Sequence, residues 1–190
     1  MVKNVFWWNP RGQGMVVGTG SLTIQEKIAR ARDLLDVWGV ELGAQVWVSD
    51  SLERLRACIE ASRQLMADMG VVDECRRCEE VEGGSCCGSG IENRYNEVLL
   101  LINLLLGVSL PEGAKRPKSC YFLGEMGCTL LARHVLCVNY LCARLRERLT
   151  PAQLSCLQDA SGEELETKFR FHETIKRFLS RRADGLDPSR

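Results

Sequence analysis

The stretch that decides the fold is SGIENRYNEVLLLINLLLG, residues 89–107. Its opening Ser89 stands three residues before Glu92. This is the spacing of a capping box, in which a hydroxyl and a carboxylate satisfy free N–H groups at a helix start. The residues that follow are apolar on almost every side of a helix, up to Gly107. Such a helix is buried by its neighbours, so we predict that it lies at the centre of the molecule.

The segments upstream have the pattern of amphipathic helices. Residues 23–39 open with Thr23 and Glu26, again at capping-box spacing, and residues 50–70 open with Asp50. Both segments carry one apolar stripe at three- and four-residue spacing. We therefore expect two helices whose stripes belong to the core.

The downstream half has helical signals as well. A helix is expected over residues 128–149, whose basic end suits the negative pole of the helix dipole. A short helix is expected from Thr150, and a last one over residues 161–182. Residues 14–20 and 45–48 could be extended, but they alternate too little to be convincing strands. The fold class is therefore predicted to be all-α.

The length of 190 residues and the 45% apolar content suit one small globular domain. We expect an irregular N-terminal arm over residues 1–22, a single helical domain over residues 23–182, and a polar tail over residues 183–190. The domain is expected to have a cysteine-rich metal-binding core, within residues 75–142, and irregular connecting loops.

The charge balance and the hydropathy pattern exclude several function classes. Twenty-five basic residues match twenty-five acidic ones, so we expect no nucleic-acid partner. The longest apolar run, residues 98–106, is about half of the roughly 20 residues that cross a bilayer, so we expect no membrane partner. The amino end has no pattern of a secretory signal. We expect a cytoplasmic protein.

Ten cysteines against two histidines are the unusual feature of the sequence. In a reducing compartment, clustered cysteines indicate metal ligation before disulfides. Two residues between a pair of cysteines let both sulfurs face one ion, about 2.3 Å away for zinc. We predict zinc or iron, including an iron–sulfur cluster, and no other cofactor. The predicted ligands are Cys75, Cys78, Cys86, Cys87, Cys120, Cys128, Cys137 and Cys142.

These cysteines resemble those of the zinc- or iron-chelating cysteine-cluster family. Its pattern begins CxxC, a short gap and CC, and continues with C-x-F-L, G-C, R-P-x-x-C and a final Cys. The corresponding residues here are Cys75 to Cys78, Cys86-Cys87, Cys120 to Leu123, Gly127-Cys128, Arg133 to Cys137, and Cys142. The chain departs from the family in a longer gap before Cys86 and at His134 and Val138. The resemblance implies a metal site and does not name a reaction.

The spacing of two cysteine pairs predicts more than one metal atom. Cys86 and Cys87 are adjacent and cannot easily aim both sulfurs at one tetrahedral ion, so we expect a paired or polynuclear site. They precede the start of a helix, whose positive pole favours thiolates. Cys137 and Cys142 are about 140° apart on an ideal helix. Either that helix is interrupted near residues 139–140, or the two cysteines serve different metal atoms.

A site of four thiolates on a divalent ion has about two negative charges, which neighbouring groups must balance. Arg133, one helical turn before Cys137, is the first candidate for this supporting role. The other cations near the cysteines in sequence are Arg76, Arg77, Lys115, Arg116 and Lys118.

Several other residues have simpler interpretations. Cys58 and Cys156 fit apolar helix patterns and are expected to be packed thiols. His134 is expected to be a surface or supporting group rather than a ligand, and His172 is expected to face solvent. Asn103 is expected to make a structural hydrogen bond to a neighbouring helix, with contact to metal-bound sulfurs as the alternative.

Two alternative functions remain open at this point. One is a thiol-dependent enzyme, in which an unligated cysteine is activated by a helix start or by His134; whether the protein is an enzyme is left undecided. The other is a metal-stapled module that binds an unknown protein partner through Trp7 and Trp8 or through the basic last helix.

Overall fold

The computed structural model describes residues 6–7, 16–17, 22–81, 87–116 and 118–183. This part of the chain is mostly helical, which confirms the predicted all-α class. The helices are α1 (Ile24–Gly43), α2 (Val46–Asp68), α3 (Val71–Val81), the 3-10 helix η1 (Ile91–Arg94), α4 (Glu97–Leu105), α5 (Val135–Asn139), α6 (Ala143–Arg148) and α7 (Pro151–Ala183). Two antiparallel strand pairs join β1 (Phe6–Trp7) to β2 (Val16–Val17), and β3 (Leu123–Gly124) to β4 (Gly127–Cys128).

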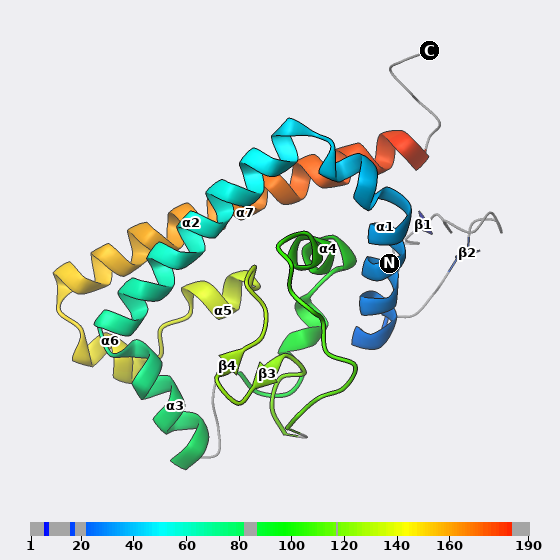
Figure 1. Ribbon diagram of the computed structural model, residues 1–190. Helices are drawn as coiled ribbons and strands as arrows, with labels where there is room; N and C mark the ends of the chain where they lie inside the picture. The colour runs from blue at the N-terminus through cyan, green and yellow to red at the C-terminus, as the bar shows by residue number, and fades with distance from the viewer. Residues whose placement is uncertain (1–5, 8–15, 18–21, 82–86, 117, 184–190) are drawn as a thin grey trace.

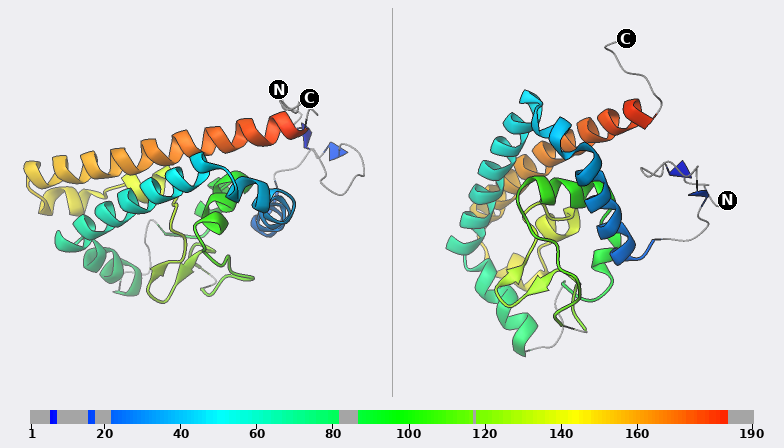
Figure 2. Two further views of the ribbon diagram at one scale, coloured as in Figure 1. Left: turned by 45° about the horizontal axis from the view of Figure 1, so that its top comes forward. Right: turned by 45° about the vertical axis from the view of Figure 1, so that its right-hand side comes forward.

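The long helices α2 and α7 lie side by side and antiparallel along one side of the molecule (Figure 1). Helix α1 turns away from α2 and packs against α4, which also contacts α7. In the left view of Figure 2 the α2–α7 pair forms one layer, and the β3–β4 hairpin lies on the other side of α4. Among the described helices, none combines the length and the hydrophobicity that crossing a bilayer requires.

The predicted central helix is confirmed in position but begins later than expected. Leu100, Leu101 and Ile102 are fully buried in α4. The expected start at Ser89 is wrong for the α-helix, because the chain makes a 3-10 turn over residues 91–94 first. Asn96 then caps α4, with its side-chain oxygen accepting the backbone N–H of Leu99 at 2.8 Å.

The first amphipathic helix is confirmed together with its capping box, in which Thr23 and Glu26 exchange hydrogen bonds. The second helix begins at Val46, before the expected Asp50, so residues 46–48 are helical and only Gln45 is extended. Packing explains the earlier start: the Trp47 ring contacts Phe171 and Phe178 of α7 at centroid distances of 6.2 Å. Helix α3, which contains Cys75 and Cys78, was not predicted.

The helix predicted over residues 128–149 is wrong as one continuous helix: only α5 and α6, in its second part, are helical. Cys128 is part of a β-hairpin, and the chain after it stays irregular until α5. The interruption near residues 139–140 is confirmed, since α5 ends at Asn139 and α6 starts after Cys142. The two helices expected from Thr150 and Ser161 are one helix, α7, because Ser161 is buried inside it rather than placed at a helix start.

Two apolar clusters hold these elements together. The first is built around α4 and includes residues of α1, α2, the β3–β4 region and α7. The second joins the end of α2 to the starts of α3 and α7 and to α6, and consists of Met66, Val71, Leu145, Leu149 and Leu157. Because α7 contributes Leu157 to the second cluster and Phe171 to the first, it connects both.

Candidate metal centre

Four of the predicted ligands are linked to Tyr95 directly or through one another and are called here the Tyr95 thiol group: Cys87, Cys120, Cys128 and Cys137. The hydroxyl of Tyr95 donates to the Cys137 sulfur at 3.9 Å. The charges of Cys128 and Cys137 act on both Tyr95 and Cys120, which places these side chains in one neighbourhood. Cys120 and Cys128 are free thiols.

Backbone pairing brings three of these thiols together from distant parts of the sequence. The N–H of Cys120 donates to the carbonyl of Cys87 at 2.7 Å, beside the antiparallel bridge between Gly88 and Ser119. Cys128 then returns through the β3–β4 hairpin, where it pairs with Leu123. The backbone hydrogen bond thus brings Cys87 and Cys120 together although more than thirty residues separate them in the sequence.

The tight turn of this hairpin depends on two glycines. Gly127 has a φ of 105°, a conformation that residues with a Cβ rarely adopt. A Cβ on Gly124 would lie 3.1 Å from the Cγ2 atom of Thr129 and 3.3 Å from the carbonyl oxygen of Gly127. The glycines therefore set the position of Cys128 opposite Leu123.

The sulfurs of Cys120 and Cys128 have matching backbone donors. Each sulfur accepts the N–H of the residue two positions later, from Phe122 and Leu130 respectively. Such hydrogen bonds favour the thiolate over the thiol and are typical partners of metal-bound sulfur. Burial has the opposite effect: it raises the pKa of Cys120 to about 12 and also raises the pKa of Cys128. In the metal-free protein these two thiols therefore hold their protons at neutral pH.

Tyr95 orients the group and was not singled out from the sequence, where it counted as one apolar position of the central helix. Its side chain is 2% exposed, and its hydroxyl accepts the backbone N–H of His134 at 2.9 Å. Burial, with the nearby charges of Cys137 and Cys128, raises its pKa far above the usual value. Tyr95 is therefore a neutral hydroxyl that can donate a hydrogen bond to sulfur.

Cations lie on the side of the group that faces α2 and α7. Arg133 and Arg63 act on Cys128, and Lys168 on α7 is influenced by Cys137. Arg133 is the candidate from the sequence, whereas Arg63 and Lys168 were missed because they lie far from every cysteine of the predicted site in the chain. On the other side, the carboxylate of Glu92 acts on Cys120.

Three further predicted ligands lie on α3 and α6. Cys75 is exposed and Cys78 half-buried on α3, and the half-buried Cys142 precedes α6 and packs against the second apolar cluster. Glu74 on α3 forms ion pairs with three arginines, two of which lie on α6 and so connect the helices. Hydrogen bonds from Arg77 and then Arg144 lower the pKa of Glu74 to about 2. Its partners are Arg77 at 2.6 Å, Arg144 at 3.1 Å and Arg148 at 3.1 Å. Cys86 lies outside the described residues.

Over the described ranges, no group of three Cys, His, Asp or Glu side chains is arranged to hold a metal ion. The Tyr95 thiol group therefore shares one neighbourhood without its sulfurs converging on a point. The donor chemistry nevertheless fits a thiophilic ion, because soft sulfur ligands, N–H donors to sulfur and nearby cations all occur at the same place.

His134 has a structural role at the edge of this group. Its Nδ1 atom accepts the N–H of Leu136 at 3.3 Å and so caps α5, while its ring packs 5.9 Å from that of Tyr95. Burial lowers its pKa, which keeps the imidazole neutral at pH 7. These contacts give His134 a structural role, and its role beside a metal stays a prediction.

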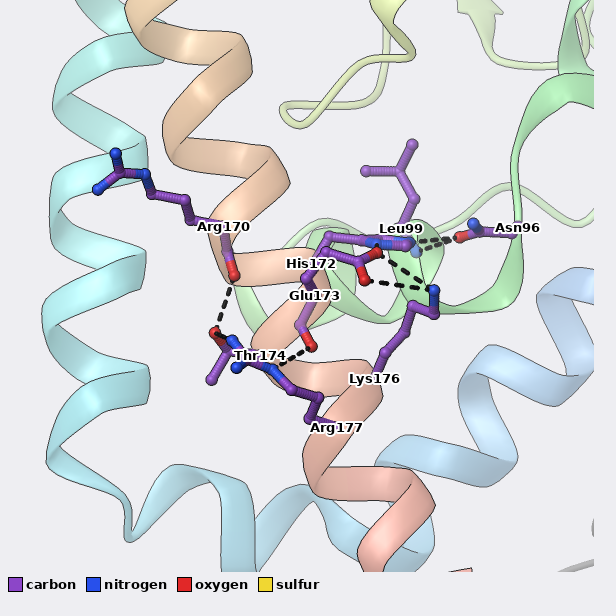
Figure 3. A network of polar contacts seen from close by, with 8 residues as sticks. All are labelled: Asn96, Leu99, Arg170, His172, Glu173, Thr174, Lys176 and Arg177. Atoms are coloured by element: carbon purple, nitrogen blue, oxygen red, sulfur yellow. Dashed lines mark hydrogen bonds and ion pairs between the residues drawn. The ribbon is translucent and has the colours of Figure 1, made fainter.

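His172 is half-buried, so the expectation that it faces solvent is wrong. Its Nε2 atom lies 3.1 Å from the side-chain oxygen of Asn96, and its Nδ1 atom lies 3.1 Å from Glu173 (Figure 3). Lys176 completes the network by pairing with Glu173 at 3.2 Å. The network fastens α7 to the start of α4 and involves none of the described cysteines.

Of the two cysteines expected to be packed thiols, one is buried and the other is not. Cys58 is buried as expected, with its sulfur 3.7 Å from the hydroxyl of Thr167, but Cys156 is exposed, so its expected packing is wrong. Trp7 lies in β1, and Trp8 lies outside the described residues.

Asn103 makes the expected structural hydrogen bonds, although to an irregular segment rather than to a helix. Its amide donates to the carbonyl of Ala132 at 2.9 Å, and its oxygen accepts the N–H groups of Leu131 and Ala132.

Comparison with family models, with curated proteins and with solved structures finds no match to this chain.

Proposed function

We propose that the protein binds a thiophilic metal ion, zinc or iron, through the thiolates of the Tyr95 thiol group. The observation that carries the proposal is the gathering of Cys87, Cys120, Cys128 and Cys137 beside the Tyr95 hydroxyl, where the N–H groups of Phe122 and Leu130 lower the pKa of Cys120 and Cys128. Buried thiols need no such donors while they keep their protons, whereas metal-bound thiolates do.

A second metal site on α3 and α6 extends the proposal. Cys75, Cys78 and Cys142 supply three sulfurs there, and Cys86 is the fourth ligand that the sequence predicts. Cys87 belongs to the other site, because its backbone carbonyl accepts the N–H of Cys120. Dividing the adjacent cysteines between two centres agrees with the argument that both cannot reach one tetrahedral ion.

Four thiolates form a closed coordination sphere, so a bound zinc would stabilise the fold rather than activate water. Apparent binding energies of zinc at such sites are on the order of 10 kcal/mol, which exceeds the contribution of most single contacts. An iron–sulfur cluster held by the same ligands would instead give the protein a redox function.

The structure supports the alternative of a thiol-dependent enzyme less well. A reactive cysteine needs a lowered pKa, and burial raises the pKa of both Cys120 and Cys128. His134, the proposed activating base, uses its Nδ1 atom to cap α5. A protein partner and a cytoplasmic location stay predictions from the sequence.

The test is metal content together with an absorption spectrum, measured on protein purified without oxygen. We expect either colourless protein with about one zinc per four predicted ligands, or iron and sulfide with a broad visible band. Cys128→Ser is expected to lose the metal of the Tyr95 thiol group. Cys156→Ser is the matched control, since that thiol is exposed and outside the predicted set. Metal-free protein with every thiol titratable would overturn the proposal.

A further inference from the structure

A layer of charged side chains lies beside Cys128 and Cys137 of the Tyr95 thiol group. Arg63 comes from α2, Glu164 and Lys168 come from α7, and Arg133 comes from the irregular segment before α5. Glu164 is fully buried and Lys168 is 7% exposed, while both arginines are half-buried. Burying charges is costly unless an opposite charge balances them.

The ends of two of these cations, Arg63 and Lys168, are fixed to the segment that connects Cys128 to Cys137. Arg63 donates to the carbonyl of Leu130 at 2.6 Å, and Lys168 donates to the carbonyl of Arg133. Both carbonyls belong to the stretch between Cys128 and Cys137. The positive charges are therefore held beside the thiols by the backbone itself.

The charge of this layer does not balance. Arg63, Arg133 and Lys168 with the one carboxylate of Glu164 leave two formal positive charges. One oxygen of Glu164 accepts the hydroxyl of Ser62, and the other has no hydrogen-bond partner. Burial and the mutual repulsion of the cations lower the pKa of Arg63 and bring that of Lys168 to about 8. A divalent ion with four thiolates has a formal charge of about minus two, which is the missing balance.

We infer that Arg63, Arg133 and Lys168 are a built-in counter-charge for the thiolates of Cys128 and Cys137, and that they select a centre with two net negative charges. The inference rests on the proposed function and adds the residues that tune the affinity of the site. Arg63 and Lys168 bind the connecting backbone rather than the ion, so they act on the centre through their charge.

The test compares zinc affinity, by competition with a chromophoric chelator, in full-length variants. Lys168→Gln keeps a hydrogen-bond donor and removes the charge, and we expect it to weaken zinc binding about tenfold or more, the range usual for groups that support metal ligands. Lys168→Arg keeps the charge and should stay close to the wild type. Lys176→Gln, an exposed lysine of the same helix, is the matched control.

The unfolding midpoint of the chelated protein gives a second readout. Because the unbalanced charge is costly without metal, Lys168→Gln should be at least as stable as the wild type when metal-free. Arg63→Gln should reproduce both results independently and keeps the test decisive if one variant does not fold. Unchanged zinc affinity in both glutamine variants would overturn the inference. A wild-type protein that takes up no zinc would instead contradict the proposed function.

Discussion

At the scale of single residues, Asn103 shows how one buried side chain can fix a loop. It is fully buried within α4, and its amide makes four hydrogen bonds, three of them to the backbone of Leu131 and Ala132. These two residues belong to the segment that connects Cys128 to Cys137. The buried amide of Asn103 thus holds the irregular segment between Cys128 and Cys137 in place against α4.

Replacing Asn103 by leucine should cost roughly 3 kcal/mol of unfolding free energy, because two N–H groups and a carbonyl would lose their buried partner. Denaturant unfolding of the metal-free protein measures the loss. The exposed Asn93→Leu serves as the control and should change stability little. Equal, small effects of both substitutions would show that the loop is held by other contacts.

The residues of the candidate site were only partly predictable. The cysteines and Arg133 stand close together in the sequence, so spacing and charge could identify them. Tyr95, Arg63 and Lys168 could not be found in this way, because a tyrosine in an apolar pattern and a lysine on an amphipathic helix have no distinguishing signal. Only the packing of α2 and α7 beside the hairpin makes them neighbours of the thiols.

At the scale of elements, the ion pairs of Glu74 that connect α3 to α6 should make the stability of the protein depend on pH. The carboxylate of Glu74 faces Arg77, Arg144 and Arg148, and its pKa is lowered from 4.5 to about 2. A depressed pKa in the folded state stabilises the protein above the unfolded value of 4.5, and this contribution is lost as the pH falls toward 2.

Glu74→Gln should therefore be less stable than the wild type at pH 6, and the difference should shrink between pH 4.5 and 2. Unfolding midpoints of chelated protein, taken across this pH range, measure it. Glu163→Gln changes an exposed carboxylate on α7 and controls for general effects of charge. A constant difference between Glu74→Gln and the wild type at all pH values would contradict this account.

The elements also show where local patterns fail. Thr23 and Glu26 predicted the start of α1 because a capping box acts within one turn. Ser161 has the same pattern in the sequence, yet it is buried in the middle of α7, where long-range packing decides. The helix expected over residues 128–149 failed for a related reason: the hairpin turn at Gly127 and the bonds from Asn103 override its apolar spacing.

At the scale of the whole molecule, the predicted class and the central position of α4 are confirmed, because they depend on composition and on one strongly apolar segment. The arrangement of the other helices could not be predicted from the sequence. Residues of α1 and α7 that form ring contacts, such as Trp38 and Phe178 at 6.2 Å, are 140 positions apart, and no local pattern connects them.

Helix α7 has a consequence for the order in which the protein is made. Synthesis releases α1, α2 and α4 first, yet Trp47 of α2 is covered by Phe171 and Phe178, which emerge more than a hundred residues later. Until α7 has been synthesised, the growing chain therefore exposes the ring of Trp47, which Phe171 and Phe178 later cover. A ribosome that stalls before residue 171 would therefore leave behind a product with an open core, which invites aggregation and capture by chaperones.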